Sequence, residues 1–121
     1  MEIKTLKNKE STRYFSDLQE KSVCKELGAN QVINSGAGKF RKGDVIQKES
    51  SFLIECKTCT SDKDSFSIKK EWIKKNKEER YTQRLSNSCI AFNFGPNQEN
   101  YYIIDSTLMK YLIEKLSEEE Y

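Results

Sequence analysis

Three charged residues lie at the ends of two short apolar segments in this 121-residue chain: Asp44, Glu55 and Lys57. Both segments have the length and the β-branched or aromatic composition of a strand. Side chains alternate along a strand, so Glu55 and Lys57 share one face. Two carboxylates can bind a hard divalent cation through oxygen, and a neighbouring ammonium can steady a nucleophilic water or the charge of a phosphate. The spacing therefore predicts a metal site that acts on a phosphate-containing substrate.

The elements that must position these residues follow from hydrophobic periodicity and turn signals. The pattern predicts a helix, three strands in an antiparallel meander, a second helix, two further strands and a final helix. The expected ranges are about 12–27, 31–34, 43–47, 51–58, 67–81, 88–94, 101–104 and a last helix from about 106. Residues 1–9 are expected to be flexible, and 117–121 form an acidic tail. The length suits one domain, 1–121, of the α/β (α+β) class.

Cap residues and apolar spacing define the helix ends. Gly28 is expected to end the first helix, and Asp105 or Ser106 to begin the last. Ser67 is expected to cap the second helix, with Ile68 and Trp72 one turn apart and facing the core. The aromatic residues assigned to the core, rather than to base stacking, are Trp72, Phe92 and Phe94. The last helix carries an apolar stripe of Leu108, Tyr111, Leu112 and Leu116.

The motif and the order of elements resemble the PD-(D/E)xK nuclease superfamily. That resemblance implies a restriction-endonuclease-like core, a divalent metal cofactor (Mg²⁺ or Mn²⁺), and hydrolysis of DNA phosphodiester bonds. Asp44 and Glu55 would ligate the metal, and Lys57 would position the attacking water and stabilise the charge on phosphorus. Many members of the superfamily take a further acidic ligand from the first helix.

Four acids of the first helix are candidates for that further ligand, and helical geometry favours Glu20. Val23, Cys24 and Leu27 lie three, four and seven residues beyond it, so Glu20 shares their apolar face. A carboxylate aimed at the core is costly unless it meets a cation. The alternative is a half-exposed helix residue, because Tyr14, Phe15 and Leu18 define a different side of the helix.

The segment around Asp44 is similar to the Holliday-junction-resolvase-like branch of the superfamily, found in archaea and bacteriophages. The carried-over features are Glu20, the small-residue loop of residues 34–38, Lys42-Gly43-Asp44 and Glu55-Cys56-Lys57. Ser35 of that loop is expected to contact a phosphate. The resemblance implies a role in DNA recombination or repair, branched DNA as substrate, and a homodimer that cuts two strands. Gly43 stands where the superfamily motif has proline.

Charge is distributed unevenly along the chain. Residues 1–90 hold 19 Lys/Arg and 13 Asp/Glu, whereas residues 91–121 hold 2 and 6. Basic clusters of this kind suit a phosphate backbone. The residues expected to contact DNA are Ser35, Lys39, Arg41, Lys42, Lys74 and Lys75. For the second helix the alternative is a solvated face with surface ion pairs, since acids are interleaved there.

The four cysteines and the absence of apolar runs limit other functions. Cys56 and Cys59 form one CxxC pair, but a four-cysteine zinc site needs two such pairs, and the chain has no histidine. Reduced, half-buried thiols are the expected state. No run of about 18 apolar residues suggests a membrane span, so a cytoplasmic protein is expected.

The combined interpretation is a Mg²⁺- or Mn²⁺-dependent endodeoxyribonuclease for Holliday or other branched junctions. Two alternatives stay open at this point. One is a nuclease of the same fold that acts on flaps, nicks or duplex DNA. The other is a DNA-binding module without catalysis, against which the intact Asp44, Glu55 and Lys57 argue.

Overall fold

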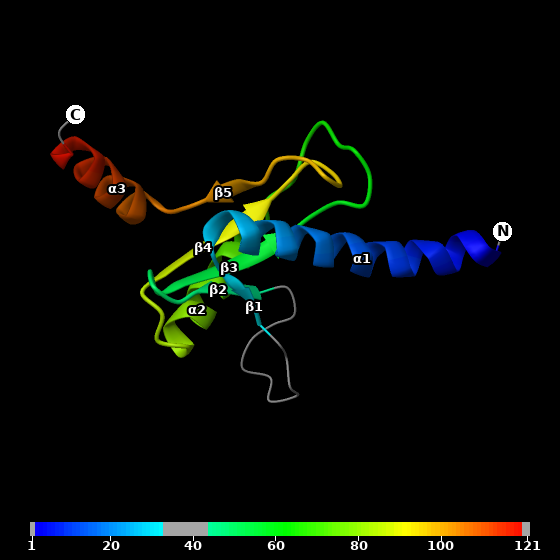
Figure 1. Ribbon diagram of the computed structural model, residues 1–121, viewed down its shortest axis with the longest axis horizontal. Helices are drawn as coiled ribbons and strands as arrows, with labels where there is room; N and C mark the ends of the chain where they lie inside the picture. Colours follow the sequence, from blue (N-terminus) through cyan, green and yellow to red (C-terminus); the bar gives the residue numbers. More distant parts are fainter. Residues whose placement is uncertain (1, 33–43, 120–121) are drawn as a thin grey trace.

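The computed structural model describes residues 2–32 and 44–119, with side chains from Arg13 onward. Within these residues the chain is an α/β fold of three helices and one five-stranded mixed sheet (Figure 1). The elements in chain order are α1 (Glu2–Leu27), β1 (Asn30–Gln31), β2 (Asp44–Gln47), β3 (Phe52–Lys57), α2 (Lys70–Thr82), β4 (Asn87–Phe92), β5 (Tyr101–Ile103) and α3 (Ser106–Glu118). The predicted order of helices and strands is confirmed. None of the described helices is long and apolar enough to cross a bilayer.

The strands lie side by side in chain order, β1-β2-β3-β4-β5. The first three form the expected antiparallel meander, and β5 returns antiparallel to β4. β3 and β4 are parallel, because α2 crosses over between them. β3 is therefore the central strand: β4 pairs with all of Phe52–Lys57, and β2 pairs with Phe52–Glu55.

Alternation along β3 divides its side chains between two layers. Ile54 belongs to a buried cluster with Val23 of α1 and Val45 of β2, so this face packs against α1. Leu53 points to the opposite face and is fully buried. The apolar side chains on both sides explain why β3 forms the middle of the sheet. Glu55, two residues after Leu53, shares its face.

Three predicted helix ends are confirmed, and the starts of α1 and α2 differ from the prediction. Gly28 adopts φ 63° after α1, as a glycine C-cap requires, and Asp105 caps α3 by accepting a hydrogen bond from the Leu108 amide. α1 begins at Glu2, earlier than expected, and its predicted end at Leu27 is confirmed.

The prediction for the start of α2 is wrong. The helix begins at Lys70, its N-cap Lys69 makes no side-chain cap bond, and Ser67 lies outside it. Ile68 is therefore not a core residue and is 36% exposed. Phe66 takes the apolar role instead, because its ring contacts Trp72 at 6.2 Å and Phe92 at 5.3 Å between centroids.

Candidate functional site

Asp44 and Glu55 lie directly opposite each other on β2 and β3. They are Cα partners in the antiparallel register, so both side chains point to the same face of the sheet. Opposite residues of such a pair have Cβ atoms about 5 Å apart. Asp44 is 1% exposed and Glu55 is 4% exposed. Two buried carboxylates at this separation form an oxygen-rich donor pair of the kind that Mg²⁺ and Mn²⁺ prefer.

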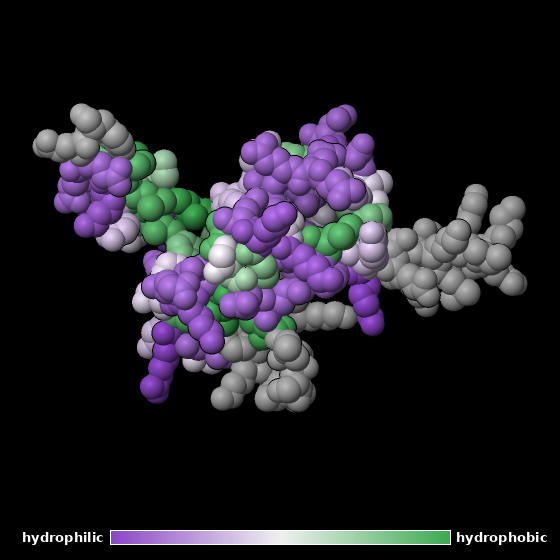
Figure 2. Space-filling model, in the orientation of Figure 1, coloured by the Kyte–Doolittle hydropathy of each residue, from purple (hydrophilic) through white to green (hydrophobic). Residues whose placement is uncertain are grey.

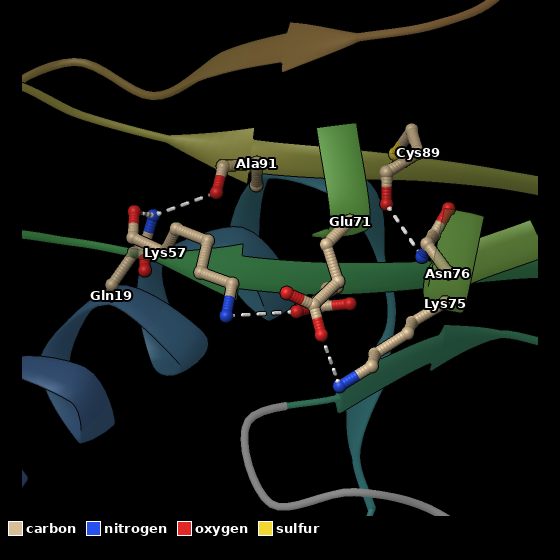
Figure 3. Close-up of polar contacts among 8 residues, drawn as sticks. Gln19, Lys57, Glu71, Lys75, Asn76, Cys89 and Ala91 are labelled. Atoms are coloured by element: carbon tan, nitrogen blue, oxygen red, sulfur yellow. Dashed lines mark hydrogen bonds and ion pairs between the residues drawn. The ribbon is translucent and has the colours of Figure 1, made fainter. Parts of the chain in front are cut away.

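Lys57 completes a group of three charges on this face. Its Nζ lies 2.9 Å from Oε2 of Glu55 (Figure 3). The Lys57 side chain is 28% exposed, whereas that of Glu55 is 5% exposed. The ammonium therefore offsets the charge of a buried carboxylate, and part of the lysine side chain is accessible to solvent.

Trp72 of α2 covers the Lys57 ammonium from the helix side. The Nζ of Lys57 lies 4.5 Å from the ring centroid, a cation–π distance, and Nζ of Lys69 lies 5.7 Å from the same ring. The ring is half-buried and is supported by Phe66, which packs on Phe92 of β4. Trp72 thus has a contact with the site beyond the core role predicted for it. The signal was a tryptophan on a basic helix, which does not identify its partner.

Glu20 lies on the other side of β3. It is half-buried on α1 and accepts a hydrogen bond of 3.0 Å from Gln31 Nε2. Burial raises the pKa of the Cys56 thiol, and the negative charge of Glu20 adds to that rise. Cys56 points away from the Glu55 face, so Glu20 is on the α1 side of the sheet.

Of the three predicted metal ligands, Asp44 and Glu55 are neighbours and Glu20 lies apart from them. Within residues 2–32 and 44–119, no group of three or more His, Cys, Asp or Glu could hold a metal ion. Asp44 and Glu55 are brought together by strand pairing, and Glu20 does not join them in such a group.

Gln19 is a residue that the sequence interpretation missed. It is 3% exposed, and its Nε2 donates to the carbonyl oxygens of Lys57 at 2.8 Å and Ala91 at 3.3 Å (Figure 3). These two carbonyls lie near the ends of the parallel strands β3 and β4. Gln19 therefore ties α1 to the backbone of Lys57. Its only signal in the sequence is the four-residue spacing to Val23, which any helical core position would share.

The predicted DNA contacts divide into two sets. Lys74 and Lys75 are exposed on α2, and Lys75 pairs with Glu71 at 2.7 Å. A hydrogen bond from Lys75 holds the pKa of Glu71 below its usual value. The residues that lie outside the described part of the chain are Ser35, Lys39, Arg41 and Lys42.

All four cysteines are free thiols. Burial raises the pKa of Cys89 to about 12 and that of Cys59 above its usual value. Thiols with raised pKa are poor nucleophiles and poor metal ligands at neutral pH. Among the described residues, Cys56 and Cys59 belong to no group of three or more His, Cys, Asp or Glu that could hold a metal ion.

The site is thus a buried carboxylate pair, an adjacent lysine that an aromatic ring covers, and a basic helix beside them. Its donor set suits a hard divalent cation, and its partly exposed lysine suits an anionic substrate. No protein-family model, curated protein or solved structure matches this chain.

Proposed function

We propose that this protein is a metal-dependent endonuclease that hydrolyses DNA phosphodiester bonds. The observation that carries the proposal is the juxtaposition of Asp44 and Glu55 on paired strands, with the Lys57 ammonium 2.9 Å from the Glu55 carboxylate. Like charges opposite each other in a sheet are destabilising, and buried carboxylate pairs of this kind are typical of functional sites. The resemblance to PD-(D/E)xK nucleases indicates what that function would be.

Asp44 and Glu55 would hold a Mg²⁺ or Mn²⁺ ion. When bound, such an ion supplies Lewis-acid polarisation of a phosphate oxygen and lowers the pKa of a coordinated water. Lys57 would donate hydrogen bonds through Nζ to the attacking water or to a phosphate oxygen. Its positive charge also stabilises the extra negative charge that develops at phosphorus in the transition state. For Glu20 to act as a third ligand, its carboxylate would have to move from the α1 side of the sheet to the face that carries Asp44 and Glu55.

Branched DNA is the proposed substrate, and it rests on the resemblance to junction resolvases. The segment that would recognise it holds Ser35, Lys39, Arg41 and Lys42. Lys74 and Lys75 on α2 extend the positive charge on the helix that carries Trp72. Contacts of this kind bind phosphates without reading sequence, so affinity depends on DNA shape and on salt.

A cleavage panel tests the activity. The protein is incubated with Mg²⁺ or Mn²⁺ and labelled four-way junction, flap, nicked duplex, linear duplex and single-stranded DNA. Asp44→Asn, Glu55→Gln and Lys57→Met are each expected to lower cleavage at least a hundredfold, whereas Glu71→Gln, an exposed carboxylate on α2, is expected to cut normally. Absence of metal-dependent cleavage on every substrate, or full activity of Asp44→Asn, would contradict the proposal.

A second function, a DNA-binding module without catalysis, is favoured by one observation. Glu20 lies across the sheet from the carboxylate pair, so no three-ligand group forms among the described residues. Binding measured in Ca²⁺ or EDTA separates the two functions. If the parent binds junction DNA tightly but cuts nothing with any metal, the module is the better description.

A further inference from the structure

Among the described residues, the final helix meets the rest of the chain near its start, where Thr107, Leu108 and Tyr111 line a hollow with residues of α2 and β4. None of the α3 residues is buried. Its apolar side chains are exposed to 49% at Met109, 54% at Tyr111, 41% at Leu112, 53% at Ile113 and 61% at Leu116. The helix projects away from the sheet, at the end opposite the N-terminus of α1 (Figure 1). Figure 2 shows the apolar surface gathered along α3 and where it joins the body.

An amphipathic helix of this length is not stable without a surface to cover its apolar side. Thirteen residues form α3, which is near the limit at which isolated helices are marginal in water. Met109, Leu112, Ile113 and Leu116 recur at three- and four-residue spacing and form one broad stripe. Most stability of such helices comes from packing of that stripe.

The same chain carries an uncovered apolar groove on the α1 face of the sheet. A hollow of about 490 Å³ lies between the end of α1, the β2–β3 turn and β5. Its apolar lining includes Leu27, Phe52, Ile54, Tyr102 and Ile104, with Gln47, Glu49 and Ser50 at the rim. Phe52, Tyr102 and Ile104 also pack on the buried core cluster, so the floor of the groove is continuous with the core.

The chain's own α3 is held out of this groove. Only Ile104 and Asp105 separate β5 from α3. Asp105 is fixed at both sides, because it caps Leu108 of α3 and pairs with Nζ of Lys77 on α2 at 3.1 Å. α2 contacts the face of the sheet opposite α1, so this ion pair directs α3 away from the groove. Short links of this kind favour exchange of a segment between copies over its return to the same copy.

We infer that α3 of one copy lies in the groove of a second copy, and that the exchange is reciprocal. One chain carries both the helix and the groove, so a two-fold dimer covers both surfaces in both copies. No uncovered helix or groove then remains to bind a third copy. A second hollow on α3 shares Ile104 with the groove; its lining combines Ile104, Met109 and Ile113 with the polar or charged Asp105, Ser106, Lys110 and Glu114. This inference goes beyond the proposed chemistry and does not depend on it.

The size of the exposed surface is sufficient for a stable dimer. With roughly 100 Å² for each of the four side chains of the stripe, the two helices and the grooves that receive them would bury about 1,600 Å² in total. That value is within the range of stable protein–protein interfaces, whereas weak contacts bury less than about 1,200 Å².

Light scattering on the full chain tests the association. The parent is expected to be a dimer at micromolar concentration. Leu112→Glu with Leu116→Glu is expected to be a monomer with an intact sheet, because neither residue contributes to the core. Thr107→Glu with Ser117→Glu adds the same charge on the polar side and should stay dimeric. A monomeric parent, or a dimer that survives Leu112→Glu with Leu116→Glu, would overturn the inference.

Cross-linking distinguishes exchange from return of the helix to its own groove. One variant carries Leu116→Cys on α3 and another carries Glu49→Cys at the groove rim, and the two are mixed and treated with a short bis-maleimide. A covalent dimer that depends on both cysteines supports exchange, with the parent as control for its own four thiols. A chain carrying both substitutions that cross-links only within itself, as a monomer, would overturn it.

Discussion

The ammonium of Lys57 lies 4.5 Å from the centre of the Trp72 ring, and Trp72 is the one tryptophan of the chain. The candidate site therefore contains its own spectroscopic reporter. A cation above an indole ring contributes about 1 kcal/mol and restricts where the ammonium can go. Trp72 is a positioning residue for Lys57, and its emission responds to the site whether or not DNA is cut.

Fluorescence gives the first prediction. Lys57→Met is expected to shift or brighten Trp72 emission, whereas Lys69→Met, which removes the more distant ammonium at 5.7 Å, should change it less. Addition of Mg²⁺ should also change the emission of the parent, because the ion competes with Lys57 for Glu55. The response to Mg²⁺ should vanish in Asp44→Asn. An identical response in that variant would place the cation elsewhere.

The ion pair of Glu55 and Lys57 gives a second prediction, about stability. Lys57→Met leaves the Glu55 charge buried without its cation, and we expect a loss of about 3 kcal/mol in the free energy of unfolding. Glu55→Gln in the Lys57→Met background should restore most of that loss. Lys75→Met is the matched control, since its partner Glu71 is exposed and such pairs contribute at most about 1 kcal/mol. Urea titration measures all four proteins, and equal effects of Lys57→Met and Lys75→Met would contradict the prediction.

Gln19 gives a third prediction. Gln19→Leu keeps the volume but removes the donor to the Lys57 and Ala91 carbonyls, and a loss of about 1–3 kcal/mol is expected. Gln98→Leu is the control, because the Gln98 amide donates to Asp62 at the surface. If Gln19 also positions Lys57, cleavage by Gln19→Leu should fall at saturating DNA while the binding affinity is retained. A loss of affinity alone would assign Gln19 a structural role only.

Contacts between residues close in the sequence were predictable, whereas contacts made by α2, which connects the parallel strands β3 and β4, were not. The two-residue spacing of Glu55 and Lys57 and the meander that pairs Asp44 with Glu55 are local, so the sequence predicted both. Trp72 reaches Lys57 only because α2 returns across the sheet, and no spacing along the chain encodes that contact.

The apolar face of the first helix was predicted from the sequence, but Gln19 at the edge of that face was overlooked. Gln19 and Glu20 are 100° apart around the helix axis, so both border the stripe that contains Val23. Periodicity cannot distinguish two neighbours at the edge of a stripe. The structure buries Gln19 against the strand carbonyls and leaves Glu20 half-buried beside Gln31.

Asp105 gives a prediction that depends on pH. The Leu108 amide, and next the Lys77 ammonium, hold the pKa of Asp105 below its usual value of 3.8. A lowered pKa in the folded state means that the carboxylate stabilises the start of α3 above that value, and that this contribution is lost as the pH falls through the lower one.

Hydrogen exchange of the α3 amides measures this effect. At pH 7, Asp105→Ala should lower protection in α3 by the equivalent of about 1 kcal/mol, the usual contribution of a cap. Asp105→Asn should retain the cap but not the attraction to Lys77. As the pH falls through the lowered pKa of Asp105, the parent and Asp105→Ala should converge, and a constant difference at every pH would refute the assignment.

The register between β2 and β3 gives the carboxylate pair an all-or-none character. Side chains alternate with a period of two, so a slip of one residue would send Asp44 and Glu55 to opposite sides of the sheet. The two carboxylates therefore lie opposite each other on one face only in the observed register of β2 against β3. Because β3 is also the central strand, Glu55 is held in place by the ladder that pairs β3 with β4. Amides of β3 should therefore exchange at the rate of the whole domain, and the binding capacity for a cation should disappear in the same transition.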